Sequence, residues 1–179
     1  MFRLPPRLQR ATVTATLCLT LLVTNAVVAG PASATTPSTA TSWYISNRVF
    51  DLLNSERAAH GLPALHRSSA LNLSAWRHDR WMAGYNTMSH QLPGEGSLGA
   101  RITAAGYTWS ACGENIAWNS DWTLNGALYL ERVMYNEVAP YNGHRLNILS
   151  TTFRDVGVYI YMDGAHHKMW LTVDFGRHV

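Results

Sequence analysis

Two histidines and two glutamates after residue 89 could form one polar site. Each has a serine, glycine or asparagine neighbour, and the four are His90, Glu114, Glu137 and His144. Imidazoles bind divalent transition metals, and carboxylates either orient such imidazoles or act as general acids and bases. These residue types therefore allow either a metal site or an acid/base pair.

Hydrolysis is an alternative chemistry for the same residues. Glu114 and Glu137 could act as acid and base in cleaving a glycosidic bond, and Cys112 with His144 could form a nucleophile–base pair. A cysteine beside Gly113 in a compact turn is more often a small buried residue than a nucleophile. The sequence contains no H-E-x-x-H, no G-x-S-x-G and no glycine-rich phosphate loop, so it lacks the motifs typical of zinc peptidases, serine hydrolases and nucleotide-binding proteins.

Helices are expected to position much of this site. Apolar spacing predicts four of them, over residues 43–60, about 69–83, 97–105 and 124–139. Thr123 can cap the fourth helix and Pro140 terminates it. His78 falls on the apolar stripe of the second helix, which predicts a histidine packed in the core. The segment 111–119 lacks clear periodicity and is expected to be a strand or an extended loop.

The C-terminal region carries a β-hairpin pattern. Apolar residues alternate with other residues from Val156 to Met162, Asp163-Gly164 supplies a turn, and a second alternating run extends from Met169 to Phe175. Helices followed by a hairpin predict an α+β fold in which helices cover a mainly antiparallel sheet.

The N-terminal segment has the features of a secretory signal peptide. Residues 11–30 are apolar, Ala32-Ser33-Ala34 matches the small-x-small cleavage pattern, and three basic residues precede them, Arg3, Arg7 and Arg10. An uncleaved membrane anchor is the rival interpretation, since about 20 apolar residues can span a bilayer. Threonines dilute the apolar stretch, which favours cleavage, secretion and no stable membrane insertion.

Cleavage after residue 34 divides the chain into a signal peptide at 1–34, a Ser/Thr/Pro-rich leader at 35–42 and one domain at 43–179. Eleven basic and eleven acidic residues then remain, so the mature protein has no basic excess for binding nucleic acid. Cys112 is its single cysteine, which excludes an internal disulfide and leaves stability to packing. No internal repeat is visible, and a monomer is expected.

Ordered motifs extend through most of this domain. They are L-N-S-E-R-A-A-H-G-L-P-A-L at 53–65, Ser89-His90, Arg101 with A-G-Y at 105–107, G-E-N-I-A at 113–117, G-H-R-L-N-I-L at 143–149 and D-F-G at 174–176. In this order they resemble bacterial members of the CAP superfamily, the SCP-like extracellular group named for cysteine-rich secretory proteins, antigen 5 and pathogenesis-related 1 proteins. The resemblance covers about residues 49–176.

This resemblance implies a three-layer α-β-α sandwich with a cleft that holds two His and two Glu. His90, Glu114 and His144 match three of these positions directly. Helical phase favours Glu131 for the fourth, but the family's W-x-x-E pattern matches residues 134–137, which selects Glu137. Met134 stands where the family usually has tryptophan, and the disulfides and second C-terminal signature of eukaryotic relatives are absent, so the activities of those relatives transfer poorly.

Three functions remain open for the cleft. The first is binding of a divalent metal such as Zn²⁺ by His90 and His144, together with or instead of a small-molecule, lipid or cell-envelope ligand. Two protein ligands make a loose site, since tight zinc sites use three or four. The second is a purely structural polar network in an envelope interaction module. The third is a secreted glycosidase or peptidase that uses Glu114 and Glu137, although no catalytic residue is assigned.

Overall fold

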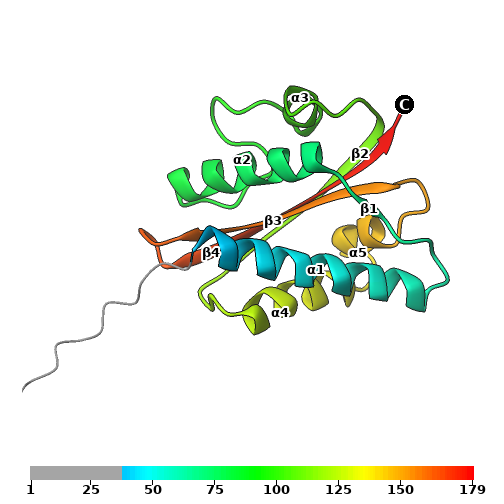
Figure 1. Cartoon of the computed structure of the whole chain (residues 1–179), viewed down its shortest axis with the longest axis horizontal. Helices are drawn as coiled ribbons and strands as arrows, with labels where there is room; N and C mark the ends of the chain where they lie inside the picture. Colours follow the sequence, from blue (N-terminus) through cyan, green and yellow to red (C-terminus); the bar gives the residue numbers. More distant parts are fainter. Residues whose placement is uncertain (1–37) are drawn as a thin grey trace, which may run out of the picture. The chain divides into compact units, whose positions relative to one another are not determined.

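The computed structural model describes residues 38–179, so the expected signal peptide and residues 35–37 lie outside the described region. Its elements, in chain order, are α1 (Thr39–Ala59), β1 (His66–Arg67), α2 (Ser69–Tyr85), α3 (Leu98–Ala104), β2 (Trp109–Asn119), α4 (Leu124–Tyr135), α5 (Gly143–Ile148), β3 (Asp155–Asp163) and β4 (Lys168–His178) (Figure 1). None of its helices is both long and apolar enough to cross a membrane.

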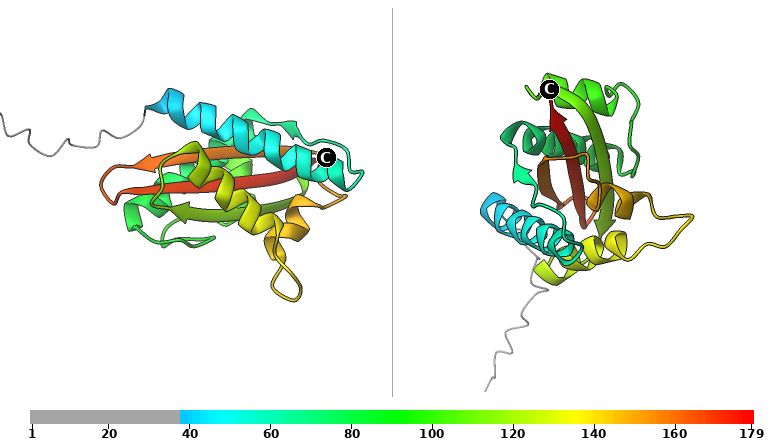
Figure 2. Two further views of the ribbon diagram at one scale, coloured as in Figure 1. Left: turned by 90° about the horizontal axis from the view of Figure 1, so that it is seen from below. Right: turned by 90° about the vertical axis from the view of Figure 1, so that its right-hand side faces the viewer.

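The sheet has the strand order β1-β3-β4-β2, with β1 parallel to β3 and the other pairs antiparallel. Helices α2 and α3 lie on one face, and α1, α4 and α5 lie on the other (Figures 1 and 2). This arrangement confirms the predicted three-layer α-β-α sandwich. It leaves β2 as an edge strand, reached by helices of both layers.

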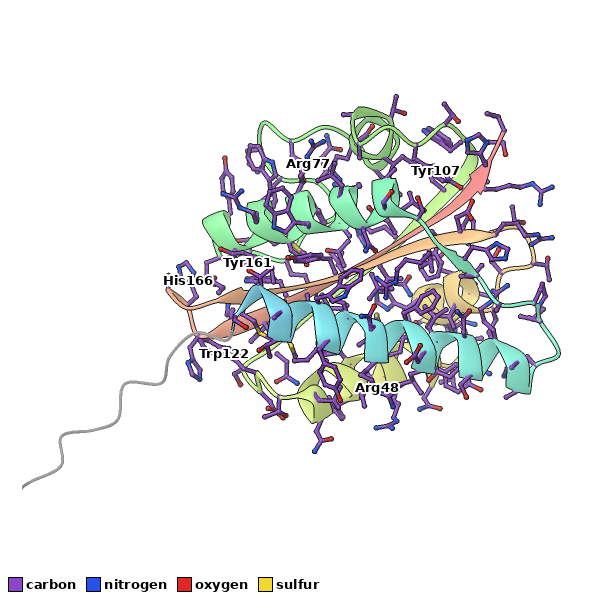
Figure 3. The ribbon with its side chains drawn as sticks, in the orientation of Figure 1. Arg48, Arg77, Tyr107, Trp122, Tyr161 and His166 are labelled. Carbon is purple, nitrogen blue, oxygen red and sulfur yellow. The ribbon has the colours of Figure 1, made fainter. Side chains whose placement is uncertain are left out.

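The predicted hairpin alternation builds the main core. The eight apolar side chains of one hairpin face are all buried with α1 and α4, from Val156 to Met162 on β3 and from Met169 to Phe175 on β4. On the other face, Tyr161 packs toward α2 and lies between α2 and α1 (Figure 3). Gly157 allows α2 to start directly on β3, because a Cβ there would lie 2.1 Å from the Leu71 carbonyl carbon.

Helix α1 begins at Thr39, four residues before the expected domain boundary at residue 43. The Ser38 hydroxyl accepts a hydrogen bond from the amide of Thr41 and so caps the helix. Ser42 is buried in this first turn. The composition of the leader suggested a spacer, but part of it supplies the cap and first turn of a packed helix.

Helix α4 ends at Tyr135, which corrects the expectation that it continues to Pro140. Both the amide and the side-chain Nδ2 of Asn136 donate to the Arg132 carbonyl, at 2.9 and 2.7 Å, and this closes the last turn. Glu137 therefore lies in the loop before α5, where helical phase does not restrict its direction.

Candidate binding cleft

The cleft lies at the edge of the sheet, where segments from both helical layers meet beside β2. It is a hollow of about 560 Å³ lined by His90, Glu114, Glu137, Tyr141, Gly143, His144, Leu146 and Asn147. All four residues selected from the sequence line it. They form two His–Glu pairs, one contributed from the α2–α3 side of β2 and the other from the α4–α5 side.

The first pair joins His90 to Glu114. The Nδ1 atom of His90 lies 2.8 Å from Oε1 of Glu114, and the His90 side chain is 61% exposed whereas that of Glu114 is 2% exposed. His90 belongs to the loop after α2, which Asn86 begins in the left-handed conformation with φ 49°. Leu92 fixes this loop in an apolar cluster with Met82 and Ile116.

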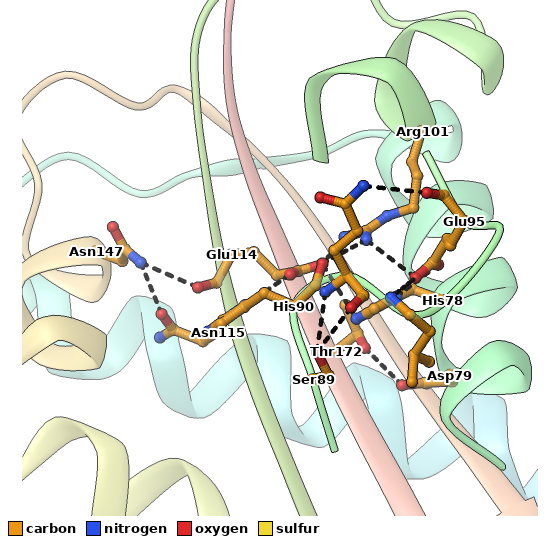
Figure 4. A network of polar contacts seen from close by, with 12 residues as sticks. His78, Asp79, Ser89, His90, Glu95, Arg101, Glu114, Asn115, Asn147 and Thr172 are labelled. Carbon is orange, nitrogen blue, oxygen red and sulfur yellow. Dashed lines mark hydrogen bonds and ion pairs between the residues drawn. The ribbon is translucent and has the colours of Figure 1, made fainter. Parts of the chain in front are cut away.

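A buried polar network that includes Arg101, Glu95 and His78 supports this pair (Figure 4). Arg101, on α3, donates to the carbonyl of His90 at 2.8 Å and forms an ion pair with Oε2 of Glu114. Glu95 lies 3.5 Å from the Arg101 guanidinium and accepts from or shares a proton with Nδ1 of His78 at 2.7 Å. The core position predicted for His78 is confirmed, but this histidine is also part of the site's foundation.

The charges of this network keep Glu114 ionised. Burial alone would raise its pKa, but the hydrogen bond to His90 and the charges of His78 and Arg101 outweigh burial and lower the pKa of Glu114. The same hydrogen bond raises the pKa of His90. Each member of the pair thus stabilises the charged form of the other.

The second pair joins His144 to Glu137. One oxygen of Glu137 lies 2.5 Å from Nδ1 of His144, and the other accepts the His144 amide at 3.0 Å. His144 is in the first turn of α5, whose N-cap residue Asn142 makes no side-chain capping bond. Glu137 takes over that role, because a carboxylate satisfies the free amides at a helix N-terminus.

Two asparagines hold the halves in register. The Nδ2 atom of Asn147 donates to the Glu114 carbonyl at 3.2 Å and to Oδ1 of Asn115 at 2.8 Å, while Nδ2 of Asn115 donates to the His144 carbonyl at 3.1 Å. Gly113 permits this contact, because a Cβ there would lie 3.0 Å from Oδ1 of Asn147 and 2.8 Å from Phe153. This asparagine clip, formed by Asn115 and Asn147, connects α5 directly to β2.

Glu131 does not belong to the cleft. It is fully buried between α4 and α1, where its carboxyl lies beside that of Glu56. Of the two glutamates considered for the fourth position, Glu137 contacts His144 and lines the hollow, whereas Glu131 does not line it.

Cys112 also lies away from the cleft. It packs with Leu71, Ile102 and Tyr107 on the α2–α3 side of β2, and it is absent from the lining of the hollow. Burial and the nearby carboxylates Asp174 and Glu114 raise its thiol pKa. Since the thiolate is the nucleophilic form, this environment does not favour a Cys112–His144 pair.

The two imidazoles can act as metal ligands. Within residues 38–179, both Nε2 atoms lack a hydrogen-bond partner, because each histidine uses Nδ1 for its glutamate. In the same range no group of three or more His, Cys, Asp or Glu side chains is arranged to hold a metal ion. An ion bound here would therefore have only these two imidazoles in this range as candidate protein ligands, with its other positions open to water or ligand.

Arg101, Glu95 and the asparagine clip were not identified as functional residues from the sequence. Arg101 and both asparagines fall within the recognised motifs, and Asn147 follows His144 by one helical turn, so motif membership was a usable signal for them. Glu95 lies in a glycine-rich loop outside the motifs, and its partner Arg101 is on the next helix. No local pattern marks it.

Comparisons with known proteins agree with this geometry. Residues 50–175 match the family model of the CAP domain, the cysteine-rich secretory protein family. The chain is 32% identical over 139 residues to the uncharacterized protein YkwD of Bacillus subtilis, covering 75% of this chain and 51% of YkwD, so it spans about half the length of that relative.

Solved structures share the fold. An extracellular SCP-domain protein of Bacillus anthracis superposes with a TM-score of 0.64 at 29% identity, covering 76% of this chain and 41% of that one. NaASP2, solved with Zn²⁺, superposes with a TM-score of 0.57 at 12% identity, covering 79% of this chain and 84% of that one, which shows similarity of fold alone. With motif order, sandwich and family match in agreement, the chain belongs to the CAP family of cysteine-rich secretory proteins.

Proposed function

We propose that this protein is an exported module that binds a divalent transition-metal ion, with Zn²⁺ as the first candidate, through His90 and His144. One observation carries the proposal: the two imidazoles line the same hollow, and each bonds a carboxylate through Nδ1, which leaves its Nε2 without a hydrogen-bond partner among residues 38–179. A carboxylate behind a ligating histidine fixes the ring and its tautomer and makes the other nitrogen a better ligand.

A two-imidazole site is an open one. Structural zinc sites use four protein ligands and catalytic ones commonly three, so two ligands favour a moderate affinity and leave room for a further group. That group would be a small or cell-envelope ligand that enters the cleft. The exposed Tyr141 and Leu146 on its rim offer contacts for such a ligand.

Export rests on the sequence of residues 1–34 and on relatives. The Bacillus anthracis relative is an extracellular protein, which supports the same location for this chain. We expect cleavage close to Thr35, to be checked by N-terminal sequencing of protein from the culture medium. Recovery of only full-length chain from the membrane fraction contradicts export.

Titration calorimetry with ZnCl₂ on protein without an affinity tag tests the metal site. We expect binding by the wild type, none by the His90→Ala/His144→Ala variant, and affinity reduced about 10- to 100-fold by Glu137→Gln, since it loses the carboxylate that orients His144. His66→Ala is the matched control, because that side chain is 80% exposed and lies outside the cleft. Lowering the pH toward 6.5 weakens binding, because protons compete for the imidazoles and His90 has a raised pKa.

Equal zinc uptake by the wild type and the double-histidine variant overturns the metal proposal. If the double variant instead loses thermal stability while neither protein takes up zinc, the four residues form a structural network. The two outcomes can be distinguished. The first is read from the amount of zinc that each protein binds, and the second from the melting temperature of each protein without metal.

Glycoside hydrolysis has less support. A general acid needs a protonated carboxyl at working pH, but the pKa of Glu114 is lowered and both oxygens of Glu137 are engaged by His144. Release of soluble fragments from purified cell wall by the wild type, lost in Glu114→Gln with an unchanged melting temperature, would establish the hydrolase.

A further inference from the structure

The outer face of α2 carries an aromatic and cationic surface that the cleft does not use. Its exposed residues recur at helical spacing, namely Arg77, Arg80, Trp81, Gly84 and Tyr85, and the half-buried Trp76 lies at its margin toward α1 and β3. None of them lines the cleft. We refer to these six residues as the α2 outer face, and Figure 3 shows Arg77 on it.

Both arginines of this face lack an acidic partner. Neither Arg77 nor Arg80 takes part in an ion pair within residues 38–179. Asp79, the one acidic residue of α2, is buried on the opposite side and accepts from Thr172 at 2.6 Å. The face therefore has two positive charges without an ion-pair partner, in a domain whose eleven basic and eleven acidic residues balance overall.

Flat aromatic rings flank these charges. Trp81 and Tyr85 stack with ring centroids 5.8 Å apart and an interplanar angle of 14°, and they remain 38% and 48% exposed. The Arg80 guanidinium lies 5.0 Å from the centre of the Trp76 ring, which holds it at the surface. From Trp76 to Tyr85 the helix advances about 13 Å, so the face suits an elongated ligand rather than a single small ion.

The face is hollowed between its rings. Arg77, Arg80, Trp81, Gly84 and Tyr85 line a hollow of about 500 Å³. A Cβ on Gly84 would meet no atom within 4 Å, so packing does not explain a glycine in this helix, where alanine has the better helix propensity. Glycine does keep the floor of the hollow low, which allows a ligand to approach the backbone.

We propose that the α2 outer face binds an acidic, carboxylate-bearing polysaccharide. Guanidinium groups bind carboxylates with paired hydrogen bonds, and flat aromatic rings with polar edges suit the mixed apolar and hydroxylated faces of sugar rings. The charge of the face selects an anionic ligand, and its hollow selects a chain that lies along the helix. A nucleic acid needs a broader basic surface than two arginines provide.

Calorimetric titration with tetragalacturonate, using neutral cellotetraose for comparison, tests this site on the mature protein. We expect binding of the acidic sugar alone, with affinity that falls as salt is added, because exposed charges are screened. Arg77→Gln/Arg80→Gln should weaken binding at least tenfold, and Trp81→Ala should do the same. Tyr129→Ala/Arg132→Gln removes an exposed aromatic and an exposed cation from α4 and should leave affinity unchanged.

Gly84→Ala separates binding from folding. The added methyl group fills the floor of the hollow but improves helix propensity, so we expect weaker binding together with an equal or higher melting temperature. A merely structural role of this face predicts no change in binding. His90→Ala/His144→Ala should bind the sugar normally, since the α2 outer face lies outside the cleft.

Four outcomes overturn the proposal. The first is no binding of tetragalacturonate, and the second is equal binding by the arginine variant and the wild type. The third is preference for vesicles of phosphatidylglycerol and phosphatidylcholine over the sugar, which would assign the face to a membrane surface. A concentration-dependent dimer that the arginine variant abolishes, without sugar binding, would assign it to a second copy of the chain.

Discussion

Buried glutamates on the two faces of the sheet have opposite surroundings. On the α2–α3 side, Glu114 is buried against an arginine and two histidines, and its pKa is lowered. On the α1–α4 side, Glu56 and Glu131 are buried beside each other, and the pKa of each is raised, chiefly by burial. The surroundings therefore favour the ionised form of the side chain in one region and the protonated form in the other.

The difference shows what a buried carboxyl needs in order to work in a site. With cations around it, a carboxylate keeps its charge and can orient an imidazole. Without such cations, the neutral acid is the form of lowest free energy in a dry interior, and the carboxyl contributes only to packing and local hydrogen bonding. The cleft has the first environment because Arg101 reaches it from α3.

The largest expected effect comes from removing this cation. Arg101→Met leaves Glu114 and Glu95 buried without their arginine, which should lower the free energy of unfolding by about 3–5 kcal/mol. Urea denaturation at pH 7 measures the change. Arg48→Met is the matched control, because Arg48 forms an exposed pair with Asp51 and should cost less than about 0.5 kcal/mol. An equal decrease in the free energy of unfolding in the two variants would show that the buried network contributes no more than an exposed ion pair.

A smaller effect of opposite sign is expected in the second region. Burial raises the pKa of Glu131 well above its usual value, so the carboxyl destabilises the fold at pH 8, where the unfolded chain ionises it freely, and Glu131→Gln should raise stability by about 1–2 kcal/mol. The same substitution at Glu95, whose carboxyl lies against His78 and Arg101, should lower stability. Thermal melting of both variants at pH 8 compares the regions directly, and a shift in the same direction would refute the contrast.

The third effect is a pH dependence, which is the smallest of the three when it is expressed per pH unit. Burial raises the pKa of Glu56 from 4.5 to about 7, so its contribution to stability is complete below pH 4.5 and is lost as the pH rises to about 7. Glu114 has the opposite dependence at lower pH. Because its pKa is lowered, its contribution to stability is present above pH 4.5 and is lost as the pH falls below that value. In chemical denaturation between pH 4.5 and 7, Glu56→Gln should flatten the slope of stability against pH by about 1 kcal/mol per pH unit. An unchanged slope would mean that Glu56 is not the titrating group.

Local patterns in the sequence predicted much of the fold. The alternation of the hairpin predicted both faces of β3 and β4, and the side chain of the expected cap Thr123 accepts a hydrogen bond from a backbone amide at the start of α4. These features depend on residues within a few positions of one another. The positions of His90, Glu114 and His144 came instead from the order of family motifs, because no local rule places them in one cleft.

Features set by distant contacts could not be predicted. The two-residue strand β1 exists because it pairs with β3, about 90 residues later in the chain, and the six-residue α5 depends on Glu137 and the asparagine clip. The Glu56–Glu131 pair joins two helices, and helical phase, which favoured Glu131 as a site residue, gave no indication that its partner is Glu56. Hydrophobic periodicity indicates which face of a helix is buried, but it does not indicate which polar group of another element that face contacts.

The central position of β4 determines when the cleft can form. Strand β4 pairs with β3 on one side and β2 on the other, and Glu114 lies opposite Asp174 in that register. During synthesis, β2 therefore has no neighbour until residues 168–178 emerge. Because such non-local pairing is slow in folding, Glu114 reaches its place beside β4 only after the C-terminal strand has been made, and the cleft forms with the completed sheet.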